Sequence, residues 1–344
     1  MLKNLTPGVI FIAIIAIVAT FISNLAPIKA LGLSPLVIGI VIGIIYANTL
    51  HHKAPQSLQP GITFSAKKIL RFAIVLYGFR ITFQEIHDIG LEGFLVSLTM
   101  LTTTMIVGIF AGTKLFGLDR DTSILTAAGA SVCGAAAVLA TEPVLKAQEY
   151  KTAIAVSMVV LFGTTSMFLY PVMYEGIIHH ATGFLHMSEH QFGIYVGGTI
   201  HEVAQVVAVP ASIPNTPDSM AHSAVIVKMT RVILIAPMLI ILGLILSFTN
   251  KSTTKEKMKL TIPWFAIYFI LVAGFNSMHL LPANIVNIIN QIDTFLLTMA
   301  MSALGVGTIF SKFKNLGLAP VYTALTMFIW LVVGGFVIVK LITN

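Results

Sequence analysis

Apolar runs of about 20 residues, the length that crosses a lipid bilayer as a helix, recur along the whole chain with short polar stretches between them. Runs such as Val9 to Phe21 and Val156 to Tyr170 are apolar around the full helix circumference, whereas a helix of a soluble protein carries polar residues at helical period. The pattern predicts about eleven spans. Their expected limits are 7–25, 31–50, 66–84, 91–112, 121–142, 152–174, 191–209, 222–247, 261–281, 284–310 and 317–341.

Composition supports this interpretation, since 57% of the residues are hydrophobic and only 10% are charged. We expect an all-α, polytopic membrane bundle that forms a single membrane domain over residues 1–344, with the lipid bilayer as its main partner. Cys133 is the single cysteine, which excludes an intramolecular disulfide and a cysteine-based metal centre. We expect no metal and no cofactor. The net charge of +7 is explained by loops between spans, so no nucleic-acid partner is expected.

Topology follows from the basic residues. Eleven crossings place the two termini on opposite faces, with thirteen Lys and Arg residues on the face of the N-terminus and five on the other. The positive-inside rule then predicts a cytoplasmic N-terminus and an external C-terminus in the cytoplasmic membrane. If the segment 129–143 is re-entrant and does not cross, the later loops change sides.

Spans five apart share patterns. Lys68 and Arg71 form K-x-x-R in the third span, as Lys228 and Arg231 do in the eighth, and G-x-x-x-G occurs in the second and seventh. The small residues of the fifth span match MAMSALGVGT at Met299 to Thr308. An odd offset predicts two inverted five-helix repeats with crossed broken helices, at 31–175 and 190–341, with 1–30 as an additional helix.

The stretch from Gly129 to Pro143, GASVCGAAAVLATEP, predicts a broken membrane helix, because lipid tolerates an interrupted backbone only where protein or a water-filled cavity covers it. Glu142 precedes proline and should end the helix, as a coupling group or as a helix-end charge. A matching break is expected at Ala303 to Gly307. Free amides at these breaks would attract an anion. The candidate residues are Gly129, Ser131, Cys133, Gly134, Thr141, Glu142 and Gly305.

Ionisable side chains within spans are functional candidates, because they are costly in lipid. His201 and Gln205 share a helical face and Glu202 lies beside them, so they could bind substrate, relay protons or bond between helices. Lys228 and Arg231 could hold an oxyanion, or pair with Glu202 or Glu142. Lys68, Arg71 and Arg80 could attract anions, or reach the headgroups. Asp293 and Asn276 are expected near span ends, solvated or capping.

We expect His201, Glu202 and Gln205 to line one cavity with both breaks, so that spans 5, 7 and 10 meet near the middle of the membrane. His201, with an ordinary pKa near 6.5, could respond there to a proton gradient.

Four segments carry a resemblance: LRFAIVLYGFR at Leu70, GASVCGAAAVLATEPV at Gly129, GGTIHEVAQVVA at Gly197 and VKMTRVILIAP at Val227. In order and spacing, over nearly the whole chain, they resemble the YeiH-like sulfate exporter family, related to bile-acid/sodium symporters and cation/proton antiporters. The resemblance implies inverted repeats with crossed broken helices, a small anion such as sulfate, H⁺ or Na⁺ as coupling ion, and allows a homodimer. The intramembrane aspartate typical of proton antiporters is absent from the broken helix, which leaves Glu142, His201 or Glu202 in that role.

The sequence therefore predicts a secondary transporter that moves a small anion outward, and no enzyme. A channel is the alternative; it would need a continuous polar pore. An intramembrane hydrolase using Cys133 and His201 is a third, weaker alternative, because no orienting group or oxyanion hole is evident.

Overall fold

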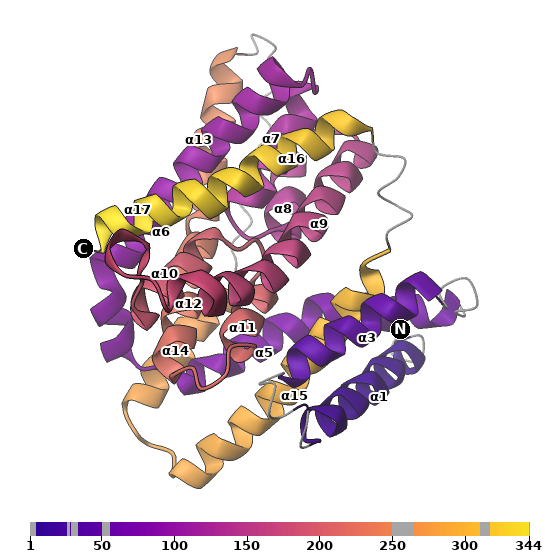
Figure 1. The fold of residues 1–344 in the computed structure, drawn as a ribbon. Coiled ribbons are helices and arrows are strands. Elements are labelled where there is room, and N and C mark those ends of the chain that lie inside the picture. The colour runs from indigo at the N-terminus through magenta and orange to yellow at the C-terminus, as the bar shows by residue number, and fades with distance from the viewer. Residues whose placement is uncertain are drawn as a thin grey trace. The chain divides into compact units, whose positions relative to one another are not determined.

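The computed structural model describes residues 5–25, 28, 34–49, 56–249, 264–309 and 317–343. Regular structure in these ranges is helical, with no strand, as the sequence predicts. Many of the basic loop residues lie outside them, namely Lys3, Lys29, Lys53, Lys251 to Lys259, Lys312 and Lys314. The main helices (Figure 1) are α1 (Thr6–Ser23), α3 (Pro35–Thr49), α4 (Gln59–Phe64), α5 (Leu70–Tyr77), α6 (Phe83–Phe110), α7 (Arg120–Ser131), α8 (Ala135–Leu145), α9 (Glu149–Met173), α10 (Glu189–Thr199), α11 (Val203–Ala211), α12 (Asp218–Ile233), α13 (Ile235–Thr249), α14 (Trp264–Ser277), α15 (Ala283–Gly307), α16 (Leu318–Ile329) and α17 (Gly335–Ile342).

Short π-helical segments extend or join several of these helices. They are η4 (Ser65–Ile69), η6 (Ala111–Leu115), η7 (Tyr174–Ile178) and η10 (Trp330–Gly334). The last of them joins α16 and α17 into one long helix, drawn in yellow in Figure 1.

Six helical segments of the described chain are long and apolar enough to cross a membrane: 6–23, 83–115, 150–178, 218–246, 283–307 and 318–342. The expected count of eleven is not confirmed. Two of the expected spans, 121–142 and 191–209, are each divided into two short helices. α7 has 12 residues and α8 has 11, about 18 Å or less each, which is too short to cross the hydrocarbon core alone.

The chain forms two compact units that each draw on several parts of the sequence. Unit 1 comprises 1–88, 207–222 and 264–313, and unit 2 comprises 89–206, 223–263 and 314–344. Neither unit coincides with one of the expected repeats, and the repeat division stays a prediction.

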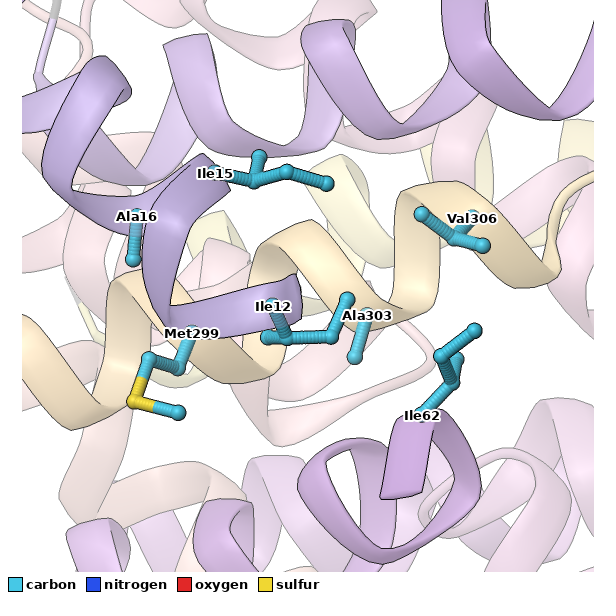
Figure 2. Packing of buried hydrophobic residues seen from close by; sticks show 7 residues of the cluster. All are labelled: Ile12, Ile15, Ala16, Ile62, Met299, Ala303 and Val306. Carbon is cyan, nitrogen blue, oxygen red and sulfur yellow. The ribbon is translucent and has the colours of Figure 1, made fainter. Parts of the chain in front are cut away.

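Unit 1 packs α1, α3, α4 and α15 around a cluster of apolar side chains (Figure 2). Its buried members are Ile12, Ile15, Ala16, Ile62, Met299, Ala303 and Val306. Glycines bring the backbones together: a Cβ on Gly43 of α3 would lie 2.9 Å from Gly305 Cα of α15. The G-x-x-x-G of the second span thus serves helix packing. Elsewhere α1 presents apolar side chains outward, with Ile17 58% and Phe21 68% exposed, as expected of a lipid-facing surface.

Unit 2 contains most of α6, the long helices α9 and α16 to α17, and the residues between α7 and α8 and between α10 and α11. α7, α8 and α9 share a buried cluster of Leu125, Val138, Ala155 and Val159, while Met158 and Phe162 of α9 pack on Ala324 of α16. This frame positions the short helices.

Candidate functional site

The first break lies between α7 and α8. α7 begins after Asp119, whose side chain accepts the backbone N–H of Thr122 at 3.2 Å, a standard N-cap. The helix ends at Ser131, and Gly134 has φ 75°, a left-handed conformation that glycine adopts without strain. The sequence therefore predicts the position of this break correctly.

α7 and α8 form a hairpin that enters and leaves on the same side. Lys151 at the start of α9 pairs with Asp119 at 2.7 Å and with Asp121 at 2.8 Å, and both aspartates lie at the start of α7. Because α8 ends at Leu145, only a few residues before α9 begins, its end lies at that level too. A Cβ on Gly129 of α7 would be 2.7 Å from Val138 Cγ2 of α8. We call α7, 132–134 and α8 the first hairpin.

Glu142 does not end the helix, contrary to the prediction. α8 continues to Leu145 with Pro143 inside it, and Lys146 ends it in a left-handed conformation with φ 52°. Pro143 is the ninth of the eleven residues of α8, so its missing N–H removes only the bond to the carbonyl of Leu139, and the helix ends two residues later. Glu142 is partly exposed on the arm of the hairpin, while Thr141 is buried and donates to Ala137 O at 2.8 Å.

The second break lies between α10 and α11. α10 starts with a capping box of Ser188 and Gln191 and ends at Thr199; Ile200 is extended and α11 starts at Val203. His190 Nδ1 at the start of α10 lies 3.0 Å from Ser223 Oγ on α12. α10 and α12 meet again at Gly198 and Arg231, so they run in the same direction. The chain therefore turns back between Ile200 and Ser223, and we call α10 with residues 200–206, the part that belongs to unit 2, the second hairpin.

The two hairpins enter from opposite ends of unit 2, because α9 links their bases. Lys151 at the start of α9 binds the base of the first hairpin. Tyr174, about 35 Å further along at helical rise, packs on Phe192 of α10 with ring centroids 4.4 Å apart. Between these ends, Tyr170 donates to Thr199 Oγ1 at 2.9 Å. The hairpins are thus inverted relative to each other, and their tips lie midway.

Two buried cations on α12 join the tips. Lys228 Nζ donates to Val132 O at 2.5 Å and to Ile200 O at 2.7 Å. Arg231 donates through Nε to Ser131 O at 3.1 Å, through Nη2 to Ser131 O and to Ala130 O, and through Nη1 to Gly198 O at 2.5 Å. Both side chains are fully buried. They occupy the carbonyl ends of α7 and α10, where the helix dipoles favour positive charge.

These contacts revise the expected role of Lys228 and Arg231. The hypothesis of an oxyanion clamp requires free guanidinium donors, yet Nε, Nη1 and Nη2 of Arg231 all bind backbone carbonyls. In the described residues neither cation lies within ion-pair distance of Glu202 or Glu142. Arg231 and Lys228 hold the two tips together.

Glu202 occupies the amide end of α8. A Cβ on Gly134 would be 2.5 Å from Glu202 Cγ and 3.1 Å from Oε1, and the carboxylate accepts the backbone N–H of Ala135. The backbone N–H of Glu202 donates to Gln205 Oε1 at 3.2 Å. His201 and Gln205 are buried, each 2% exposed, and Glu202 is partly exposed. The N-terminus of α8, expected to be open to an anion, is thus covered by a carboxylate of the chain.

The structure brings Ser131, Cys133, Gly134, His201, Glu202, Gln205, Lys228 and Arg231 to the two tips, and Gly129 lies just below them. Cys133 is buried at the first tip. His201 Nδ1 is buried and has no hydrogen-bond partner in the described part of the chain. Spans 5 and 7 therefore meet as expected.

The expected break at Ala303 to Gly307 is wrong. α15 is an unbroken helix of 25 residues, and Gly305 packs in unit 1 against α3. The seventh span, and not the tenth, carries the second break, so the offset of five does not pair the broken helices.

Of the three cations expected to attract anions or reach the headgroups, two are exposed and the third, Arg80, binds other groups of the chain. Lys68 and Arg71 are exposed, with Arg71 5.8 Å from the Phe265 ring centroid. Arg80 Nε donates to Asp293 Oδ2 at 3.1 Å, and its Nη2 donates to Asn290 O and Thr294 Oγ1. Asp293 is fully buried, so the expectation that it is solvated is wrong. Its place in the middle of the apolar run 283–307 was the signal that sequence reasoning missed.

These features define an α-helical membrane protein with several candidate spans and a polar centre at the tips of two hairpins. The chain belongs to the family described as Conserved hypothetical protein 698, which matches residues 7–324. It is 45% identical over 334 residues to the UPF0324 inner membrane protein YeiH of Escherichia coli (strain K12), covering 97% of this chain and 93% of the relative. It is 44% identical to a UPF0324 membrane protein of Bacteroides thetaiotaomicron, with 98% of both chains covered, and 46% identical to one of Bordetella pertussis, with 98% and 94% covered. The family resemblance found in the sequence is confirmed.

Proposed function

We propose that this membrane protein is a secondary transporter of a small anion, with its substrate site at the tips of the two hairpins. The observation that carries the proposal is the pair of inverted hairpins whose tips are joined by Lys228 and Arg231. Non-helical backbone at membrane depth is tolerated where it is buried in protein or lines a cavity, and broken helices in inverted positions are typical of secondary transporters.

The chemistry of the tips favours an anion. α8 and α11 both begin beside Glu202, at Ala135 and Val203, so amide ends of two helices and their partial positive charge converge there. Sulfate is the first candidate because of the family resemblance alone, and outward movement has the same basis. Alternating access would follow if the hairpins open in turn, each toward the side from which it enters.

The hairpins also sharpen the proposed topology. With two re-entrant segments, nine of the eleven expected segments cross, and the termini remain on opposite faces. Compared with the model of eleven crossings, only the loops between the two hairpins move to the other face of the membrane. Lys146 and Lys151 are the basic residues in those loops, and all later loops keep their side. By their place in the chain, fifteen Lys and Arg residues then fall on the face of the N-terminus and three, Lys29, Arg80 and Lys340, on the other. We therefore propose a cytoplasmic N-terminus and an external C-terminus.

Two other functions receive less support. A channel needs a continuous polar pore, whereas the carbonyls at both tips are occupied by buried cations. A hydrolase needs a histidine oriented by a third group, and His201 Nδ1 has no such partner within the described residues.

Counterflow in proteoliposomes tests the proposal. The purified protein is reconstituted with unlabelled sulfate, phosphate or nitrate inside, and entry of the same labelled anion is measured against empty liposomes. A transporter should show entry that is stimulated by anion on the opposite side. Equal entry with and without internal anion would identify a channel, and no entry above empty liposomes for all three anions would contradict anion transport.

A further inference from the structure

We propose that Glu202 is the group that binds a proton when the anion binds, so that anion and proton move together. The inference rests on the proposed transport function. It deepens that function by naming the coupling ion and the residue that carries it.

The first step is that Glu202 occupies the place an anion would take. Its carboxylate accepts the backbone N–H of Ala135 and lies against Gly134, at the amide end of α8. Lys228 and Arg231 are already engaged, because each of their side-chain nitrogens donates to a backbone carbonyl of the tips. An anion that reaches the start of α8 must therefore displace the carboxylate.

The second step is the charge of the displaced carboxylate. In the described residues Glu202 has no ion-pair partner within 4 Å. Two anionic groups at one site repel each other, and a carboxylate without partners is costly at membrane depth. Taking up one proton on a carboxylate oxygen removes both costs. The Ala135 N–H then binds the anion, and release of the anion lets Glu202 lose the proton and return.

The surroundings single out Glu202 as the titrating group. The charged or titratable groups that interact with it are Cys133 from the first tip and Lys228 from α12, and His201 precedes it in the chain. His201 is fully buried in the positive field of Lys228 and Arg231, which opposes a further positive charge. Glu202 is partly exposed and so is the group that a proton can reach. The sequence hypothesis of a histidine proton carrier is replaced by this one.

The test uses full-length protein in proteoliposomes, with valinomycin and potassium holding the membrane potential at zero. The probe is whichever of sulfate, phosphate and nitrate shows the strongest counterflow. With the inside alkaline by one pH unit, the wild type should accumulate the anion about tenfold, since one proton is carried for each anion. Glu202→Gln should only equilibrate the anion while keeping counterflow. Glu142→Gln, a carboxylate on the hairpin arm, is the matched control and should behave like the wild type.

Three results would overturn the proposal. They are tenfold accumulation by Glu202→Gln, counterflow without accumulation by the wild type, and loss of accumulation in Glu142→Gln alone. If the wild type shows counterflow, a failure of proton coupling is distinguished from a failure of the proposed transport function.

Proton uptake on adding the anion to weakly buffered detergent-solubilised protein gives a second measurement. The wild type and Glu202→Asp should each take up about one proton per bound anion, and a wild type that takes up none would contradict the proposal even if Glu202→Gln fails to fold.

Discussion

Lys228 Nζ lies 2.5 Å from the carbonyl oxygen of Val132, and the same ammonium binds Ile200 O at 2.7 Å. One side chain thus joins the tips of two hairpins that are 68 residues apart in the sequence. A buried carbonyl without a donor costs about 1–3 kcal/mol, and this lysine serves two of them.

Lys228→Met should therefore destabilise the protein strongly. The variant keeps the apolar stem but leaves Val132 O and Ile200 O without this donor, and we expect a loss of about 2–6 kcal/mol from two such groups. Thermal unfolding in detergent, followed by circular dichroism, measures the change. Lys68→Met, which replaces an exposed lysine, is the control and should unfold like the wild type. Equal unfolding temperatures for both variants would show that the tips do not depend on the ammonium.

Gly134→Ala should damage the site in two separable ways. Its φ of 75° strains any other residue, and the added Cβ would meet Glu202 Cγ at 2.5 Å. Gly183→Ala provides the matched control, because Gly183 has φ 68° but no atom within 4 Å of the added Cβ, so only backbone strain applies.

Unfolding measurements on the pair separate strain from contact. Gly134→Ala should lose more stability than Gly183→Ala, and adding Glu202→Ala to Gly134→Ala should recover the difference, as a coupling energy of about 0.5–3 kcal/mol. Simple additivity of the two substitutions would mean that Glu202 does not lie against the first tip.

A pH effect is expected at the base of the first hairpin. Partial burial alone would raise the pKa of the Asp119 carboxyl, but the hydrogen bonds from Lys151 and Thr122 outweigh it, and the net shift is downward. A carboxyl whose folded pKa is below its unfolded value stabilises the fold above the unfolded pKa, near 3.9, and loses this contribution as pH falls through the folded pKa. We expect the wild type to lose stability below about pH 4.

Lys151→Met tests the cause of this effect. Without the ammonium, the pKa of Asp119 should return toward its ordinary value, and the part of the acid-dependent loss that comes from this pair should disappear. Unfolding temperatures at pH 7 and pH 3 measure both proteins. The same difference between the two pH values in wild type and variant would contradict the assignment.

The sequence predicts the position of the first helix break correctly, but it does not predict which other helix is broken. Small residues at Gly129 to Gly134 indicate the first break because only glycine suits the φ of Gly134, and that requirement is local. The small residues at Met299 to Thr308 resemble those at Gly129 to Gly134 in composition but serve another purpose. Gly305 lets α15 approach Gly43 of α3 closely. Composition alone does not distinguish a break from close packing of an intact helix.

Long-range contacts also decide the roles of the charged residues. Arg80 and Asp293 are 213 residues apart, and the breaks that Arg231 joins come from two helices other than its own. Hydrophobic periodicity reports which residues are in the membrane, but the partner of a buried charge depends on the packing of helices. For this reason the cluster at His201 to Gln205 is recognisable from the sequence, whereas the backbone partners of Lys228 and Arg231 are not.

The direction of transport connects the proton to the topology. If Glu202 carries a proton with the anion, an inward proton gradient favours uptake, and outward movement requires an anion gradient that exceeds it. Imposing opposite pH gradients on the same vesicles should reverse net flux of the anion. This expectation runs against the exporter label that the family resemblance implies.

The proposed re-entrant path of the first hairpin can be tested with single cysteines in a Cys133→Ser background. Lys114 and Gln148 are exposed on either side of the first hairpin, and Leu185, 53% exposed, precedes the second. A helix that crossed between residues 120 and 145 would place Lys114 and Gln148 on opposite faces, whereas the ion pairs of Lys151 with Asp119 and Asp121 place them on one face. A membrane-impermeant maleimide should therefore label Lys114→Cys and Gln148→Cys only from the cytoplasmic side, in inside-out vesicles, and Leu185→Cys only in intact cells. Labelling of Lys114→Cys and Gln148→Cys from different sides would remove the first hairpin, and with it the inverted pair on which the proposed transport site depends.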